Sequence, residues 1–136
     1  MIHFPNLKTI GFALYFFSVS LPAASHHSFG MFDMARFEPL EGTVLAFQWT
    51  NPHVILWVEQ ASEDGSESKT WGIELTSPGN LQRAGFSRRS LNPGDVVTVI
   101  MSPLRSGNAG GAFRSIENKT TGMSYEYDYA KVGSVQ

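Results

Sequence analysis

Histidine is the residue type in this chain that is best suited to metal binding and proton transfer, and it occurs at few positions. Apart from His3, the histidines are His26 and His27, which are adjacent, and His53, which directly follows Asn51-Pro52. A neutral imidazole binds metal ions and transfers protons near neutral pH. The chain contains no cysteine, so thiolate ligands and thiol catalysis are excluded.

The segment before His26 has the layout of a secretory signal peptide. Lys8 and the α-amine of Met1 are positive, residues 10–19 are apolar and uncharged, and residues 21–25 hold a proline and small side chains. The apolar run is about half of the ~20 residues that a membrane-spanning helix needs. We therefore expect residues 1–25 to be removed on export to the periplasm or the medium, with no transmembrane anchor.

The cleavage position decides which metal site the chain can form. Cleavage after Ser25 makes His26 the first residue, whereas cleavage after Ala24 is nearly as compatible with the small residues and leaves Ser25 first. With His26 first, its α-amine and imidazole can chelate one ion, and His53 can supply a third nitrogen. His27 offers a second route, through the amine, the intervening amide and its own imidazole. Nitrogen ligands in tetragonal geometry favour Cu(II), so the sequence predicts a copper site of His26, His27 and His53.

A second interpretation leaves the histidines outside any site, so that the chain is a non-metal ligand- or protein-interaction module that binds through loops around residues 49–51 and 107–111. In it, His26 and His27 belong to a solvated chain end, and His53 is a strand-edge residue hydrogen-bonded to a loop. Catalytic zinc is disfavoured, because no H-E-x-x-H or similar spacing is present. The chain also lacks G-x-S-x-G, P-loop and G-x-G-x-x-G motifs. No catalytic set can be named, so we expect a binding protein rather than an enzyme.

Three other groups of residues have structural interpretations that we prefer. Four glutamates could pair as acid and base, but solvated sheet edges explain them better. Three tryptophans could stack on a sugar or base, but core positions suit their apolar neighbours better. Four arginines could bind an anion, but a solvated rim is the simpler reading. These residues are Glu38, Glu41, Glu59 and Glu74; Trp49, Trp57 and Trp71; and Arg83, Arg88, Arg89 and Arg105.

Composition limits the partners further. The chain has 12 carboxylates against 10 lysines and arginines, for a net charge of -2. A nucleic-acid binder would normally show a basic stripe, and no basic cluster here exceeds Arg88-Arg89. We expect a small ligand or a protein as the partner, and no nucleic acid. Residues 26–136 are enough for one domain, which without disulfides depends on its hydrophobic core alone.

The pattern of apolar residues predicts a single β domain. Alternation predicts strands near residues 40–49, 53–60, 69–75, 94–102 and 111–118. Ser77-Pro78 followed by Leu81 predicts a short helix near residues 77–84. The tail from Tyr125 onward contains no convincing element. The residues expected in the core are Trp71, Ile73, Leu75, Val97 and Val99.

Five strands with one helix between the third and fourth are the element order of an OB-type barrel. Closure also removes exposed strand edges. We therefore predict an all-β fold, a small closed five-stranded OB-like barrel with one short helix between strands 3 and 4; a small β-sandwich is the alternative. The Asn51-Pro52 turn would place His53 at a barrel rim. If residues 26–37 fold back across the barrel, His26 and His53 can meet.

Several motifs of the chain occur together in one family. They include His26-His27-Ser28-Phe29, Trp49-Thr50-Asn51-Pro52-His53, Ser77-Pro78 and Leu91-Asn92-Pro93-Gly94-Asp95. With these motifs the chain resembles an uncharacterised family of small secreted bacterial proteins, known only as a domain of unknown function. The resemblance implies export, to a Gram-negative periplasm, and a compact β domain. It implies no activity.

Overall fold

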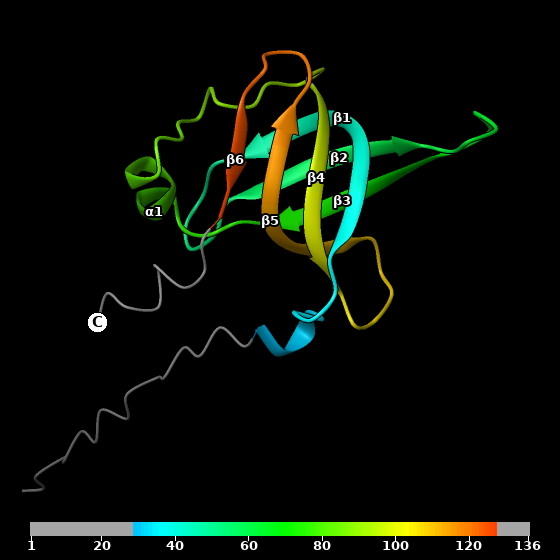
Figure 1. Ribbon diagram of the computed structural model, residues 1–136, viewed down its shortest axis with the longest axis horizontal. Coiled ribbons are helices and arrows are strands. Elements are labelled where there is room, and N and C mark those ends of the chain that lie inside the picture. Colours follow the sequence, from blue (N-terminus) through cyan, green and yellow to red (C-terminus); the bar gives the residue numbers. More distant parts are fainter. Residues whose placement is uncertain (1–28, 128–136) are drawn as a thin grey trace, which may run out of the picture.

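The computed structural model describes residues 29–127, and their main elements are strands (Figure 1). A 3-10 helix comes first, and a single α-helix separates β3 from β4. Each of the five predicted strands overlaps one of the observed strands, and the helix is also confirmed. In chain order the elements are η1 (Phe29–Met31), β1 (Glu38–Gln48), β2 (Ile55–Ala61), β3 (Ser68–Glu74), α1 (Pro78–Arg83), β4 (Val96–Pro103), β5 (Gly110–Asn118) and β6 (Ser124–Glu126).

Strand β1 pairs with two neighbours and gives the sheet its curl. Residues 38–43 pair with β4, and residues 43–48 pair with β2, both antiparallel. The register shifts between Val44 and Ala46, as in a β-bulge, and such bulges bend a strand. A Cβ on Gly42 would lie 2.4 Å from the backbone oxygen of Glu59, so only glycine fits there. Figure 1 shows the resulting curve of β1 around the sheet.

The barrel closes where β3 meets β5. Residues 72–74 of β3 pair in parallel with residues 110–112 of β5, and β5 also pairs antiparallel with β4. The closed order is therefore β1-β2-β3-β5-β4 and back to β1, with β6 added beside β5. This confirms the predicted closed five-stranded barrel with a helix between the third and fourth strands, and it is consistent with an OB-like architecture.

Inward-facing residues of all five barrel strands form one core. Ile73, Leu75, Val97 and Val99 are buried, as predicted. Trp71 is only partly buried and packs against this core from the β3 side. Leu40, Val44, Leu56, Val58, Phe113 and Ile116 complete the strand contributions to the core.

Helix α1 and a row of aromatic rings complete the core outside the strands. Ser77 caps the helix by accepting a hydrogen bond from Asn80 N, and Leu81 is fully buried. Phe86 contacts the ring of Tyr125 edge to face, at 4.6 Å between centroids. Tyr125 belongs to β6, which pairs with β5. The prediction that the tail contains no element from Tyr125 onward is therefore wrong, because tyrosines that contact the core stabilise a short sixth strand.

Candidate functional site

His53 is held at the end of β2 by the turn before it and by β3 beside it. The Asn51-Pro52 peptide bond is cis, and Thr50 Oγ1 donates a hydrogen bond to the His53 carbonyl at 3.3 Å. On the β3 side, Val54 N donates to Thr76 O at 3.1 Å, and Leu75 N donates to Val54 O at 2.8 Å. The pairing of β2 with β3 thus continues past both strand ends and brings His53 to the last residue of β3.

That last residue is Glu74, and its Oε1 contacts Nδ1 of His53. The two side chains are 26% and 32% exposed, so the pair is reachable from solvent but partly shielded from it. Glu74, predicted to be a solvated sheet-edge carboxylate, is instead partly shielded and paired with His53. The carbonyl of His53 accepts a hydrogen bond from the loop residue Thr50, as the second interpretation expects, but its imidazole contacts Glu74. The strand register, which pairs Ile55 with Glu74, brings the two residues together.

The contact defines what the imidazole can do. A carboxylate at Nδ1 favours the tautomer with the proton on Nδ1, so in the neutral ring the lone pair lies on Nε2. Metal-binding histidines are commonly held in this way by a carboxylate, which orients the ring. Within residues 29–127, no group of three His, Cys, Asp or Glu side chains is arranged to hold a metal ion. His53, oriented by Glu74, can therefore offer one imidazole nitrogen at the surface.

Residues 29–37 dock on the barrel at the loop between β4 and β5. Phe32 is 4% exposed and forms an antiparallel bridge with Leu104. Asp33 N donates to Pro103 O at 2.8 Å, and Arg105 N donates to Met31 O at 2.9 Å. The described part of residues 26–37 therefore packs on the barrel. Figure 1 shows η1 next to the loop that follows β4.

Arg114 fastens the same segment from β5. Its Nε donates to Ser102 Oγ at 2.9 Å, and its Nη2 donates to Met34 O at 3.1 Å. Its guanidinium carbon also lies 4.9 Å from the centre of the Phe37 ring. Ser102 is fully buried and donates onward to Arg36 O at 3.1 Å. Arg114 could not be singled out from the sequence, because its position depends on a β-bulge in the pairing of β5 with β4.

The docked segment is connected to β3 by successive backbone contacts. Phe32 bridges to Leu104, and Leu104 N donates to Gly110 O at 3.0 Å. Gly110 pairs with Gly72, which lies two residues before Glu74 on β3. The described chain therefore starts at the loop between β4 and β5, which is itself paired with β3 through Gly110.

The remaining predicted site residues have different outcomes. His26 and His27 lie outside the described residues. Trp49 is buried, as predicted, but the core assignment of Trp57 is wrong, since 37% of this residue is exposed. The other three glutamates have solvent-accessible partners, namely Arg36 for Glu38, Lys119 for Glu41 and the Ser68 hydroxyl for Glu59. The four arginines Arg83, Arg88, Arg89 and Arg105 are exposed, as expected of a rim.

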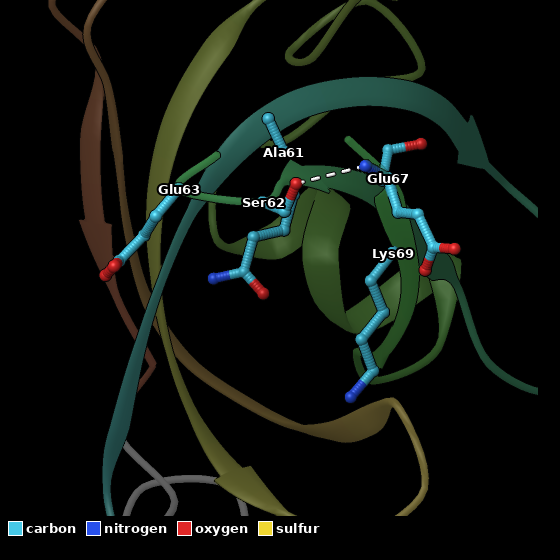
Figure 2. A pocket seen from close by; sticks show the side chains of 7 residues that line it. Ala61, Ser62, Glu63, Glu67 and Lys69 are labelled. Atoms are coloured by element: carbon cyan, nitrogen blue, oxygen red, sulfur yellow. Dashed lines mark hydrogen bonds between the residues drawn. The ribbon is translucent and has the colours of Figure 1, made fainter. Parts of the chain in front are cut away.

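Two open hollows on the surface offer no reactive set. One, of about 460 Å³, lies at the β2–β3 hairpin, where Glu67 N donates to Ser62 Oγ and Lys69 points into the space (Figure 2). The Lys69 ammonium lies 4.4 Å from the centre of the Trp71 ring and makes a cation–π contact with it. The other, of about 600 Å³, lies over β4, β5 and β6, with Thr98 and Ile100 among its lining residues.

Residues 29–127 include no helix that is long and apolar enough to cross a membrane.

Comparison with known proteins places the chain in a family without identifying its activity. The family of unknown function DUF6152 matches residues 15–114, which is most of the chain and includes both His53 and Glu74. No curated protein and no solved structure matches the chain. The protein therefore belongs to the family of unknown function DUF6152.

Proposed function

We propose that this protein is a small bacterial periplasmic binding protein that takes up Cu(II) through His53 and the histidines at its processed amino terminus. The observation that carries the proposal is the contact between His53 Nδ1 and Glu74 Oε1. It presents a pre-oriented imidazole whose second nitrogen is suited to ligate a metal. His26, with its α-amine, and His27 complete the ligand set.

The docking of residues 29–37 supports a meeting of the two histidine sites. Successive contacts connect Phe32 to Gly72, two residues from Glu74. His26 precedes Phe29 by three residues, and an extended chain of that length covers about 10 Å. The described chain therefore starts from an anchored position on the barrel, and the proposal has residues 26–28 extend from there toward His53.

The donor set favours copper over other metals. In the proposed site, the ligands beside His53 are the nitrogen donors of His26 and His27, which precede the described residues. An α-amine, one or two imidazoles and no thiolate suit Cu(II), which also has the highest affinity in the divalent series. Amine and imidazole must both lose their protons to bind, so affinity falls as the pH is lowered.

Export and processing are part of the same proposal. Residues 1–25 act as a signal peptide, and cleavage after Ser25 leaves His26 with a free α-amine. Mass spectrometry of the exported protein tests this step. A first residue of His26 supports the ligand set, whereas a first residue of Ser25 removes the amine chelate and contradicts it.

Calorimetry with Cu(II) tests the site itself. Protein that begins at His26 is titrated beside His53→Ala and beside protein whose α-amine is acetylated. If three nitrogens share one ion, each change weakens binding, by about tenfold or more. Circular dichroism confirms that His53→Ala is folded. Equal affinity of the wild type and His53→Ala would contradict the proposal, because only a chelate at the chain end would then remain.

A further inference from the structure

Trp57 is an outward-facing tryptophan on the barrel, and the described contacts give it no role in the core. Along β2, Leu56 and Val58 are fully buried, so the residue between them points to the outer face. With 37% of its surface exposed, Trp57 differs from Trp49, which is 7% exposed.

The ring lies flat across three strands. At one end, Nε1 donates a hydrogen bond to Gln48 Oε1 of β1 at 3.1 Å. At the other end, Cζ3, Cη2 and Cε3 lie 3.0, 3.3 and 3.6 Å from the point where a Cβ on Gly72 of β3 would be. The indole therefore rests with one face on the sheet and presents the other to solvent. Glycine at position 72 leaves the room that the ring occupies.

Carboxylates lie on both sides of this ring. Glu59 is two residues further along β2 on the same face, and Glu74 is two residues beyond Gly72 on β3. Ser68 donates to Glu59 at 2.9 Å, and His53 contacts Glu74, so both carboxylates are held in place. The only basic residue in β2 and β3 is Lys69, and its ammonium is engaged over Trp71. The face around Trp57 is thus an aromatic surface with negative charge on either side.

We propose that the outer face of Trp57, flanked by Glu59 and Glu74, binds an organic cation of the alkylammonium or guanidinium type. Tryptophan is the aromatic residue that attracts such cations most strongly, through the negative face of its ring. The carboxylates add opposite charge at the rim, which steers the cation and selects against anions. This site goes beyond copper binding and requires neither a metal nor the amino terminus.

The cation can come from two sources with the same chemistry. It is either a free small molecule or the side chain of a lysine or arginine in a protein partner. Two probes represent these sources, namely tetramethylammonium and trilysine. Neopentyl alcohol, which has nearly the same shape as tetramethylammonium but no charge, is the control ligand.

Nitrogen–proton NMR of the metal-free protein tests this assignment, with the indole N–H signals of the tryptophans as reporters. At constant ionic strength, tetramethylammonium or trilysine should shift the Trp57 signal, leave the Trp49 signal unchanged and act more strongly than neopentyl alcohol. Glu59→Gln should weaken binding by about threefold. Trp57→Leu, followed through the backbone amides of β2 and β3, should weaken it by about fivefold. The outward position of Trp57 makes this variant compatible with folding.

The outcomes are distinct. Much tighter binding of trilysine than of tetramethylammonium assigns the site to a basic protein segment, and comparable binding assigns it to a free cation. Equal binding of neopentyl alcohol, unchanged binding by Trp57→Leu, or no shift of the Trp57 signal with either cation would overturn the proposal. None of these results bears on copper, because His53 is unchanged and no metal is present.

Discussion

Glu74 and His53 are 21 residues apart in the chain, yet Oε1 of the first contacts Nδ1 of the second. The contact joins the last residue of β3 to the turn before β2, and the backbone bonds between Val54, Leu75 and Thr76 keep the two segments in register. His53 lies outside the strands, but these contacts position its side chain as firmly as that of a strand residue. This is the arrangement on which a metal ligand depends.

Glu74→Gln should weaken Cu(II) binding while leaving the protein folded. In the proposed site the Glu74 carboxylate orients the imidazole of His53 toward the ion, and loss of such a supporting carboxylate costs about tenfold in metal affinity. Calorimetry at constant pH measures the change. Glu117→Gln is the matched control, since it removes the same charge from an exposed position on β5. If both variants weaken binding equally, the effect is one of net charge and the supporting role is refuted.

Two glycine substitutions should change the stability in opposite directions. Gly42→Ala places a methyl group 2.4 Å from Glu59 O, so β1 and β2 must move apart, at a cost of about 2–3 kcal/mol. Gly79→Ala lies in α1, where the nearest atom is 3.8 Å from the new Cβ, and should stabilise by about 0.5–1 kcal/mol. Denaturant unfolding of both variants provides the comparison. A denaturation midpoint for Gly42→Ala at or above that of the wild type would contradict the close approach of Gly42 to the Glu59 carbonyl.

Asn118 is fully buried, and its side chain links the loop at Asp95 to the turn at Thr120 and Thr121. Its Nδ2 donates to Asp95 Oδ2 at 2.8 Å, and its Oδ1 accepts from the backbone N–H groups of Thr120 and Thr121 at 3.0 and 3.1 Å. Asn118→Ala removes the acceptor of both threonine N–H groups and one of two donors to Asp95 Oδ2, the other being Asn92 N, and should destabilise the fold by about 3 kcal/mol. Asn108→Ala, in an exposed loop, should change the stability by less than about 0.5 kcal/mol. Similar unfolding midpoints for the two variants would contradict this account.

The β2–β3 hairpin loop should titrate at unusually low pH. Hydrogen bonds from the side chain and backbone of Ser66, and then from the Ser62 hydroxyl, lower the pKa of Asp64 from 3.8 to about 2. Because the folded-state pKa is the lower one, ionised Asp64 stabilises the loop above the unfolded pKa, and this contribution disappears as the pH falls through about 2. Carbon NMR of the carboxyl group gives the midpoint directly. Ser66→Ala should raise it, and a wild-type midpoint near 3.8 would exclude the hydroxyl contacts.

Much of the fold could be predicted because alternation and turn residues act locally. Strands, helix and barrel closure follow from segments such as residues 69–75, where Trp71, Ile73 and Leu75 alternate with polar or small side chains. Which residues of β2 face the core and which face outward could not be predicted in this way. Ile55, Leu56, Trp57 and Val58 are all apolar, so the pattern does not show which residues face outward, and only the pairing of Trp57 with Gly72 determines it.

The candidate site was only half predictable for a related reason. The position of His53 after Asn51-Pro52 marks it as a residue at a rim, and that inference needs no tertiary information. Its partner Glu74 is defined by the register between β2 and β3, which long-range packing sets. The short strand β6 was missed because Ser124, Tyr125 and Glu126 give too few residues for a period, and the contact between Tyr125 and Phe86 arises only in the folded chain.

The number of imidazoles bound to Cu(II) tests the copper proposal most directly. Electron paramagnetic resonance resolves the coupling of the copper electron to each ligated nitrogen, in protein that begins at His26 and in its His53→Ala variant. If His53 completes the site, the substitution removes one coordinated imidazole and changes the copper hyperfine splitting. Identical spectra for the two proteins would show that His53 is not a ligand and would contradict the copper site proposed for this barrel.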